Sequence, residues 1–308
     1  MPERIVIALG GNALQSGNSA PTAEAQLEVV KKTSERIAEI SRRGYEMAVV
    51  HGNGPQVGRI VLAGEAARDV VPPMPFDVCG AMSQGYIGYD LQNGIREELL
   101  NRGIYRTVST VLTQVIVDPY DDAFYTPTKV LGRYMNAQEA NEERKKGNYV
   151  IEEPGKGFRR VVSAPNPVKI VELDAVKALL DANQVVIAAG GGGIPVMEQG
   201  TTLKGASAVI EKDYTAAKLA DMVDASHLMI LTAREYMTTK DTDEKLEKIS
   251  VSDAIKLMDE GNFDPITTLP KVDACVSFVS SGEGRTAIIT KLEEAYQGIK
   301  ERIGTIIK

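Results

Sequence analysis

The sequence predicts an α/β protein built around a parallel sheet, and two observations support this fold class. Short apolar runs alternate with longer amphipathic runs along most of the 308 residues, which is typical of strands that alternate with helices. Two of the first apolar runs, at 5–9 and 46–50, stop abruptly at glycine and asparagine. A buried parallel strand that turns tightly into a helix has this pattern.

The remaining elements follow from the same patterns, taken in chain order. The apolar runs predict strands at 5–9, 46–50, 107–117, 185–189, 228–231 and 286–290. The amphipathic runs predict helices at 22–43, 56–68, 81–102, 136–146, 173–181, 213–222, 252–260, 271–279 and 291–302. The segments 149–152 and 158–162 flank a Pro-Gly-Lys-Gly turn and predict a β-hairpin.

The helix expected at 81–102 contains three glycines, Gly85, Gly88 and Gly94. Each of them lowers helix stability by about 1 kcal/mol relative to alanine. We therefore expect another segment to pack closely against that face of the helix.

The segment 118–162 differs from the rest of the chain, because it is rich in charged residues, tyrosine and turn residues. It predicts a small lid subdomain that is inserted into a single domain spanning residues 1–308. The alternative is a surface insertion without a role in function.

Composition excludes several classes of function. A formal net charge of -7 and a pI of about 5.2 argue against nucleic acid or an anionic membrane as the main partner. No apolar run reaches membrane-spanning length and no secretory signal is recognisable, so we expect a cytoplasmic protein. Cys79 and Cys275 match no metal or redox spacing, and we expect buried, reduced thiols. His51 and His227 offer no zinc-ligand spacing, and we expect no metal site built from side chains.

A third glycine-rich turn, at Gly190–Gly193, follows the strand expected at 185–189. Together with the turns at 10–11 and 52–54 it gives three turns at strand ends, and in an open parallel sheet such turns line one crevice. Bare backbone N–H groups at strand ends bind phosphate well. The chain has neither a P-loop nor a dinucleotide-binding motif, and any one of these turns alone could be purely structural.

Three lysines occupy positions where turns are expected to converge. Lys212, next to Asp213, and Lys271 both open predicted helices, where the helix dipole disfavours a cation. Lys129 lies in the predicted lid. Phosphoryl transfer needs such fixed positive groups, because the transferring group spreads negative charge over its oxygens. The alternative is that the lysines are solvated surface residues and that Asp213 serves only as a helix N-cap.

The order of these motifs resembles the carbamate kinase branch of the amino acid kinase superfamily, over essentially the whole chain. The residues that carry the resemblance are Ala8-Leu9-Gly10-Gly11-Asn12-Ala13-Leu14, His51-Gly52-Asn53-Gly54-Pro55-Gln56-Val57-Gly58, Gln84-Gly85-Tyr86-Ile87-Gly88, Pro127-Thr128-Lys129, the segment 188–196, and Ala208-Val209-Ile210-Glu211-Lys212-Asp213. Taken jointly, they are highly specific for the superfamily and fairly specific for carbamate kinase.

This resemblance implies a three-layer αβα sandwich around a mainly parallel, open, eight-stranded sheet, with a small inserted lid, in a homodimer. It implies the reaction ATP + carbamate ⇌ ADP + carbamoyl phosphate with Mg²⁺. The ATP-forming direction and a place in arginine metabolism are implied for the cell. The partners would be small-molecule substrates, without nucleic acid or a membrane.

The resemblance also implies a role for each matching position. The transferring phosphate would be held by Gly10, Gly11 and Asn12, and the carbamate end by Gly52, Asn53 and Gly54, with Gly191 and Gly192 beside them. Lys129 would reach in from the lid, Lys212 would bridge the phosphates while Asp213 orients it, and Lys271 would contact the nucleotide phosphates. The adenine would lie near Thr232, Ala233 and Tyr236.

Two departures from the family pattern fall on the nucleotide side. The family's Gly-Ser-Met is Ile266-Thr267-Thr268 here, and branched residues do not take glycine's backbone angles easily, so the loop before Lys271 is expected to differ in shape. Arg234 stands where the family has an apolar residue. In the lid, Val130-Leu131 replaces Pro-Ile and loosens one turn.

These departures leave two other functions open. One is a superfamily kinase that acts on another small carboxylate or carbamate-like acid. The other is a non-catalytic nucleotide or metabolite sensor, against which the joint presence of Lys129, Lys212, Asp213 and Lys271 speaks.

Overall fold

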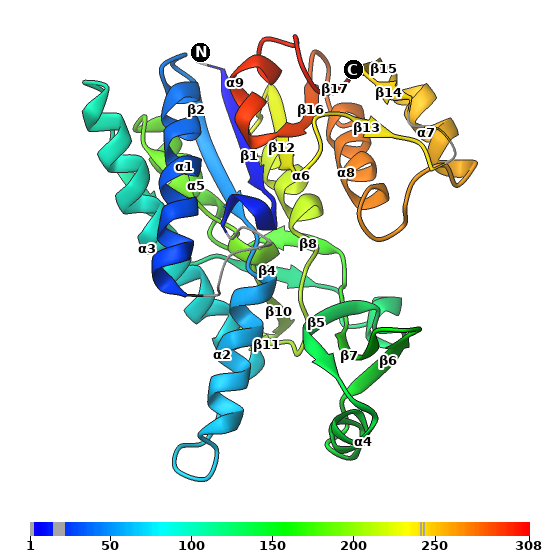
Figure 1. The fold of residues 1–308 in the computed structure, drawn as a ribbon. Coiled ribbons are helices and arrows are strands. Elements are labelled where there is room, and N and C mark those ends of the chain that lie inside the picture. Colours follow the sequence, from blue (N-terminus) through cyan, green and yellow to red (C-terminus); the bar gives the residue numbers. More distant parts are fainter. Residues whose placement is uncertain (1–2, 15–21, 241, 243) are drawn as a thin grey trace.

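The computed structural model, which describes residues 3–14, 22–240, 242 and 244–308, places a large β-sheet between two layers of helices (Figure 1). The sheet has the strand order β15-β17-β16-β12-β1-β2-β9-β3. In that order the bounds are Lys248–Ile249, Thr305–Ile307, Thr286–Lys291, His227–Thr232, Arg4–Leu9, Glu46–His51, Val185–Ile187 and Val108–Thr110. Every neighbouring pair is parallel except β16 with β17. The predicted three-layer α/β architecture is confirmed.

Three smaller sheets accompany the main one. A four-stranded sheet has the order β11-β10-β4-β8, with bounds Thr202–Gly205, Ile194–Gln199, Gln114–Val117 and Pro167–Ile170. A three-stranded sheet has the order β5-β7-β6, with bounds Lys129–Met135, Gly157–Val162 and Tyr149–Glu153. The strands β13 (Met237–Thr238) and β14 (Lys245–Leu246) form a short pair. Single 3-10 turns are η1 (Gly11–Ala13), η2 (Asp122–Phe124), η3 (Gly190–Gly192) and η4 (Leu292–Glu294).

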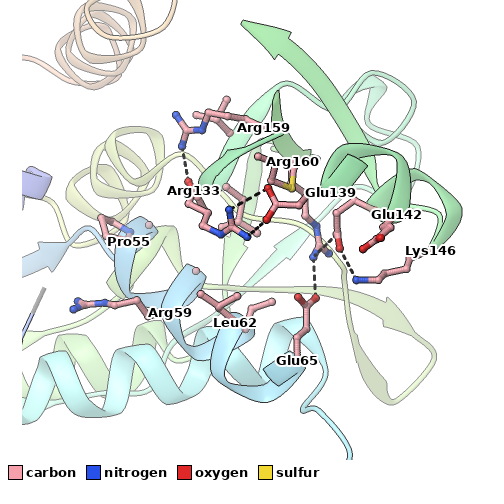
Figure 2. A pocket seen from close by; sticks show the side chains of 18 residues that line it. Pro55, Arg59, Leu62, Glu65, Arg133, Glu139, Glu142, Lys146, Arg159 and Arg160 are labelled. Atoms are coloured by element: carbon pink, nitrogen blue, oxygen red, sulfur yellow. Dashed lines mark hydrogen bonds and ion pairs between the residues drawn. The ribbon is translucent and has the colours of Figure 1, made fainter. Parts of the chain in front are cut away.

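The three-stranded sheet and helix α4 (Ala137–Lys145) form a small unit that stands against α2 (Gly54–Ala66) (Figures 1 and 2). The hairpin predicted within it is present, because β6 and β7 pair antiparallel. A cavity of about 640 Å³ lies between the unit and α2. An ion pair between Arg160 and Glu65, at 3.5 Å, connects the unit with α2 beside this cavity.

The two faces of β1 explain the layers. Ile5, Ile7 and Leu9 face one buried cluster, and Val6 and Ala8 face the other, because successive side chains of a strand alternate. The first cluster is covered by α1 (Ala23–Ser41), α3 (Phe76–Asn101) and α9 (Ala295–Gly298). The second is covered by α5 (Leu173–Asp181), α6 (Lys212–Met222) and α8 (Leu269–Ser280), on which α7 (Val251–Asp259) packs.

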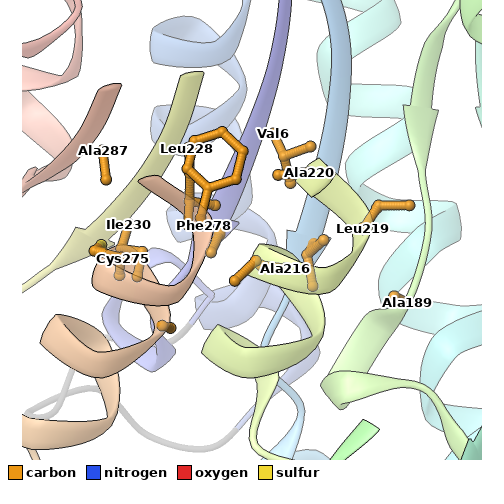
Figure 3. Close-up of a cluster of buried hydrophobic side chains, with 14 of the residues drawn as sticks. Val6, Ala189, Ala216, Leu219, Ala220, Leu228, Ile230, Cys275, Phe278 and Ala287 are labelled. Carbon is orange, nitrogen blue, oxygen red and sulfur yellow. The ribbon is translucent and has the colours of Figure 1, made fainter. Parts of the chain in front are cut away.

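Helix α6 presents small side chains to the sheet. Figure 3 shows Ala216 and Ala220 of α6 in the buried cluster with Val6, and Cys275 and Phe278 of α8 beside them. Because alanine side chains are small, α6 packs closely against β1 and α8. This packing places the N-terminus of α6 near the carboxyl ends of the strands. Both cysteines are free and buried, as the sequence predicts.

The glycines of α3 have the predicted role at two of three positions. A Cβ on Gly88 would overlap Thr110 of β3, and a Cβ on Gly94 would overlap Ser34 of α1. At Gly85 nothing lies within 4 Å, so the prediction is wrong there. The close contacts fix α3 against both the sheet and α1.

Two predicted elements are corrected. The single strand expected at 107–117 is two strands in different sheets, β3 and β4. The N–H of Thr113, between them, donates to the side chain of Gln84, and the carbonyl of Thr113 accepts from Ile194 of β10, so the chain passes from the main sheet to the four-stranded sheet here. The helix expected at 291–302 reduces to the short η4 and α9, because Glu301 and Gly304 adopt left-handed conformations and the chain returns as β17.

The described part of the chain contains no helix with both the length and the apolar character needed to cross a membrane.

Candidate active site

The three glycine-rich turns lie together at the carboxyl ends of adjacent strands of the main sheet, as predicted. We call these turns, 10–11, 52–54 and 190–193, the glycine edge. Gly10, Gly52 and Gly190 follow β1, β2 and β9, which are adjacent parallel strands. The N–H of Gly10 donates to the carbonyl of Leu231 at 2.9 Å, and the N–H of Gly52 donates to the carbonyl of Leu9 at 3.1 Å. The turns after β1 and β2 therefore each begin with one more hydrogen bond to the neighbouring strand before the chain leaves the sheet.

The glycines at 190–192 permit close approaches that no side chain would allow. A Cβ on Gly190 would overlap the His51 ring, and a Cβ on Gly191 would overlap the Asn53 amide. Gly191 and Gly192 also have φ values of +70° and +93°. The turn after β9 is thus packed directly onto the residues that end β2.

His51 is a structural residue of this edge. It is buried, and its Nδ1–H donates to the carbonyl of Gly52 at 2.8 Å. Burial outweighs this hydrogen bond and lowers the pKa of His51 to about 4. The imidazole is therefore neutral near pH 7 and has its other edge against Gly190.

The three predicted lysines converge on the N-terminus of α6. Lys212 pairs with the carboxylate of Asp213, and Lys271 of α8 donates to the other oxygen of Asp213 at 3.0 Å. Lys129 of β5 pairs with Glu211, which is the N-cap residue of α6. Residues that are more than 140 positions apart in the sequence are thereby gathered within one turn of a helix.

Asp213 is the centre of this cluster, and its role differs from the N-cap alternative. Glu211 occupies the N-cap position, and Asp213 lies inside the first turn with 0% of its side chain exposed. Burial alone would raise the pKa of Asp213, but the charges of Lys212 and Lys271 outweigh it and lower the pKa. Conversely, burial would lower the pKa of Lys271, and Asp213 outweighs that effect and raises it.

One contact joins the lysine cluster to the glycine edge. The Lys212 side chain passes beside Gly52, where a Cβ would lie 3.8 Å from its Cδ and Cε atoms. The side chain of Lys212 is 11% exposed and that of Lys271 is 19% exposed, so neither side chain is fully buried. Fixed cations beside glycine-rich turns at strand ends are an arrangement that suits a polyanion.

The residues predicted for the nucleotide are only partly brought together. Thr232 and Ala233 line a cavity of about 180 Å³ with Leu231 and Ala13. Thr232 also lies beside Gly10, at the end of β12. Tyr236 is not part of that lining, and the ammonium of Lys245 lies over its ring at 4.8 Å.

The remaining predicted positions flank the site. Gly54 opens α2 and lines the larger cavity of Figure 2, whose lining includes none of the three lysines. Gly11 and Asn12 form η1. The side chain of Asn12 lies outside the described part of the structure.

Sequence reasoning missed three residues that shape this site. Glu211 holds Lys129, while Ser83 and Gln84 of α3 bond to Asn53 and to the turn after β9. Gln84 and Glu211 each lie in a motif that carries the family resemblance, and that membership was their only signal in the sequence. Within the described residues, no group of three or more His, Cys, Asp or Glu side chains could hold a metal ion.

Comparison with known proteins places the chain in a family. The sequence matches the amino acid kinase family model over residues 3–291. It is 50% identical to the carbamate kinase-like protein YqeA of Escherichia coli, covering 100% of this chain and 99% of that protein. It is 48% identical to the carbamate kinase of Clostridium perfringens, covering 99% of both.

The solved structures agree with the sequence comparison. The structure of carbamate kinase from Giardia lamblia bound to AMP-PNP superimposes with a TM-score of 0.93 at 37% identity, covering 99% of this chain and 98% of that one. The chain belongs to the amino acid kinase family.

Proposed function

We propose that this chain is a carbamate kinase, which transfers the γ-phosphoryl group of ATP reversibly to carbamate and gives ADP and carbamoyl phosphate. The observation that carries the proposal is the convergence of Lys129, Lys212 and Lys271 on the N-terminus of α6, next to the glycine edge. The full-length similarity to carbamate kinases supports it.

In this reaction a carbamate oxygen attacks the γ-phosphorus, and the bond to the bridging oxygen of ADP breaks. The electron pair of that bond leaves on ADP. Carbamate arrives as an anion, so its oxygen needs no general base, which fits a neutral, buried His51. Catalysis then consists of positioning and of stabilising negative charge.

The site residues divide this work. Lys212 and Lys271, which Asp213 orients, neutralise charge on the transferring and nucleotide phosphates. Backbone N–H groups of the turn that follows β1 hold the transferring phosphate, and the turns after β2 and β9 hold the carbamate end. The adenine lies near Thr232, Ala233 and Tyr236. The backbone and amide groups that we propose for this work are those of Gly11, Asn12, Asn53, Gly54 and Gly191. The N–H groups of Gly10, Gly52 and Gly192 already donate to the carbonyls of Leu231, Leu9 and Ala189, so these three glycines shape the turns.

We expect magnesium to bind together with the nucleotide. Asp213, the buried carboxylate at the centre of the cluster, already accepts from two lysines and is a poor candidate ligand. Mg²⁺ keeps several waters and binds readily to nucleotide phosphates. The substrates are therefore MgATP and MgADP, and the metal is part of the substrate.

Lys129 gives the segment 118–162 its role as a lid. The lysine lies on β5, the first strand of the small unit, and pairs with Glu211 of α6. A displacement of the unit relative to α6 would carry this amine toward or away from the phosphates. We also place the enzyme in the cytoplasm, which the free cysteines support. The family resemblance supports the ATP-forming direction and a place in arginine metabolism.

A homodimer is part of the same proposal. Helix α3 exposes Val78, Met82 and Tyr89, which are 36%, 48% and 67% exposed, and the segment before it exposes Val70 and Met74. Val78, Met82 and Tyr89 share one face of α3 by their helical spacing, and exposed apolar side chains along one helix face indicate an interaction surface. Sedimentation equilibrium is expected to give twice the chain mass of 33.2 kDa, and Tyr89→Lys combined with Met82→Glu is expected to give monomers. A monomeric wild-type protein at assay concentration would contradict the homodimer.

Replacing Gly191 with alanine is expected to lower kcat/KM by about 10²-fold, because the new Cβ displaces the Asn53 amide by roughly 1 Å. Gly200→Ala is the matched control, since Gly200 has a similar φ of +63° but open space around it. Both variants carry left-handed strain, and only the first disturbs the site. Equal activities of the two variants in a steady-state assay would remove Gly191 from the site.

A second candidate function follows from the segment before Lys271. Ile266 is 73% exposed, and the Asp264 carboxylate accepts from the backbone N–H and the hydroxyl of Thr267 at 2.7 and 2.6 Å. This branched segment replaces the family's Gly-Ser-Met, and it favours a kinase for another small carboxylate or carbamate-like acid.

A substrate panel separates the candidates. ADP release is measured with carbamate, formed from ammonium and bicarbonate, and with other small carboxylates at equal concentrations. Turnover of carbamate above all others supports the proposal, whereas turnover of another acid alone favours the second candidate. ATP binding in a calorimeter with no transfer to any acid would indicate a sensor.

A further inference from the structure

Helix α3 packs against the glycine edge and bonds to Asn53 and Gly190 through two consecutive residues. Ser83 and Gln84 are 0% and 2% exposed. Both side chains bond to residues of the proposed acceptor end, although neither residue lies at a strand end.

Ser83 holds Asn53. Its hydroxyl accepts a hydrogen bond from the Asn53 Nδ2–H at 2.8 Å and donates to the carbonyl of Gly80 at 2.6 Å. The second bond stays within α3, so the hydroxyl is oriented before Asn53 meets it. The Asn53 amide also lies against Gly191, where a Cβ would overlap all three amide heavy atoms. The amide is therefore fixed by a hydrogen bond to Ser83 and by close contact with Gly191.

Gln84 fixes the glycine turn against which the Asn53 amide lies. Its Nε2–H donates to the carbonyls of Gly190 and Thr113 at 2.9 and 3.1 Å, and its Oε1 accepts from the N–H of Thr113 at 2.8 Å. The hydroxyl of Thr113 in turn accepts from the N–H of Ala189 at 2.9 Å. One turn of α3 thus sets both Asn53 and the glycine turn on which Asn53 rests.

We propose that Ser83 is a positioning residue, whose hydroxyl fixes the Asn53 amide against Gly191 and so sets the geometry of the carbamate end. The inference rests on the proposed function, in which Asn53 binds the carbamate or carbamoyl group. Ser83 itself does not touch the substrate and acts only through Asn53. Its removal therefore affects the acceptor end and leaves the nucleotide end unchanged.

The test is a double-mutant cycle with Ser83→Ala, Asn53→Ala and the combined variant, assayed with carbamoyl phosphate and MgADP. Ser83→Ala is expected to raise the KM for carbamoyl phosphate about tenfold and to leave the KM for ADP within about twofold. The combined variant is expected to match Asn53→Ala within about twofold, because two residues that act through one contact are not additive. Ser34→Ala is the control, since Ser34 is a buried helix serine whose hydroxyl has no hydrogen-bond partner among the described residues.

Two results would overturn the proposal. One is an effect of the combined variant equal to the product of the single effects, and the other is an equal change in both KM values, as a purely structural role would give. A second readout does not depend on the reaction. Solvent exchange of the Asn53 side-chain amide protons, measured by NMR, is expected to be faster in Ser83→Ala than in wild type, and an unchanged rate would also overturn the proposal. If wild type forms no ATP, the proposed function fails while the exchange measurement still decides the role of Ser83.

Discussion

Replacing Lys212 with alanine is expected to lower kcat by about 10²- to 10³-fold, which is the usual scale for the loss of one electrostatic donor. Lys212 is the one lysine of the three that contacts both the buried Asp213 and the glycine edge at Gly52. Its ammonium therefore lies where charge on the transferring phosphoryl group would have to be stabilised. Steady-state ATP formation from carbamoyl phosphate and MgADP measures the effect.

The matched control for this variant is Lys218→Ala. Lys218 belongs to the same helix, α6, but lies almost two turns further from its N-terminus. The control is expected to keep kcat within about twofold of wild type. A loss of less than tenfold in Lys212→Ala would contradict the role assigned to Lys212.

Replacing Asp213 with asparagine is expected to have the second-largest effect, on stability and on activity together. Asparagine keeps the size of the side chain but leaves the ammonium groups of Lys212 and Lys271 without their shared counter-charge. Removal of one member of a buried charge pair costs about 3–5 kcal/mol of folding free energy. Urea unfolding of both proteins measures this difference, and kcat is expected to fall because both lysines lose their orientation.

The pH dependence of that stability difference has a defined sign. The pKa of Asp213 is lowered in the folded state, so its contribution is present above the ordinary value of 3.8 and is lost as pH falls through the lower folded pKa. The pKa of Lys271 is raised, so its contribution is present below 10.5 and is lost as pH rises through the higher folded pKa. The difference between wild type and Asp213→Asn is expected to be flat between about pH 5 and pH 9. A difference that changes steeply within that window would contradict the assignment of the charges.

The sequence was most informative where a strand is buried on both faces. The strands β1, β2 and β9 are continuous apolar runs that stop at glycine, so both the sheet and its functional edge could be predicted. The hairpin strands β10 and β11 were not predicted, because only one end of β10 is buried and β11 is largely exposed. The split between β3 and β4 was also not predicted, because the backbone of Thr113 bonds to Gln84 of α3 and to Ile194 of β10, which are far away in the sequence.

In the candidate site, too, some residues could be predicted from the sequence and others could not. Lys212 and Lys271 could be singled out because a cation at a helix start conflicts with the helix dipole. Their shared partner was harder to assign, since Asp213 at a helix start suits an ordinary capping role equally well. The roles of Glu211 and Ser83 could not be predicted, because they depend on partners 82 and 30 positions away in the sequence.

The proposed function depends on the three lysine ammonium groups surrounding one binding site for the substrate phosphates. ATP formation tests this arrangement most directly. Purified protein is incubated with carbamoyl phosphate and MgADP, and ATP is measured by a coupled assay, with Lys212→Ala alongside. We predict one ATP for each carbamoyl phosphate consumed by wild type and about 10²- to 10³-fold slower formation by the variant. Absence of ATP formation by wild type, or equal rates for the two proteins, would contradict the account.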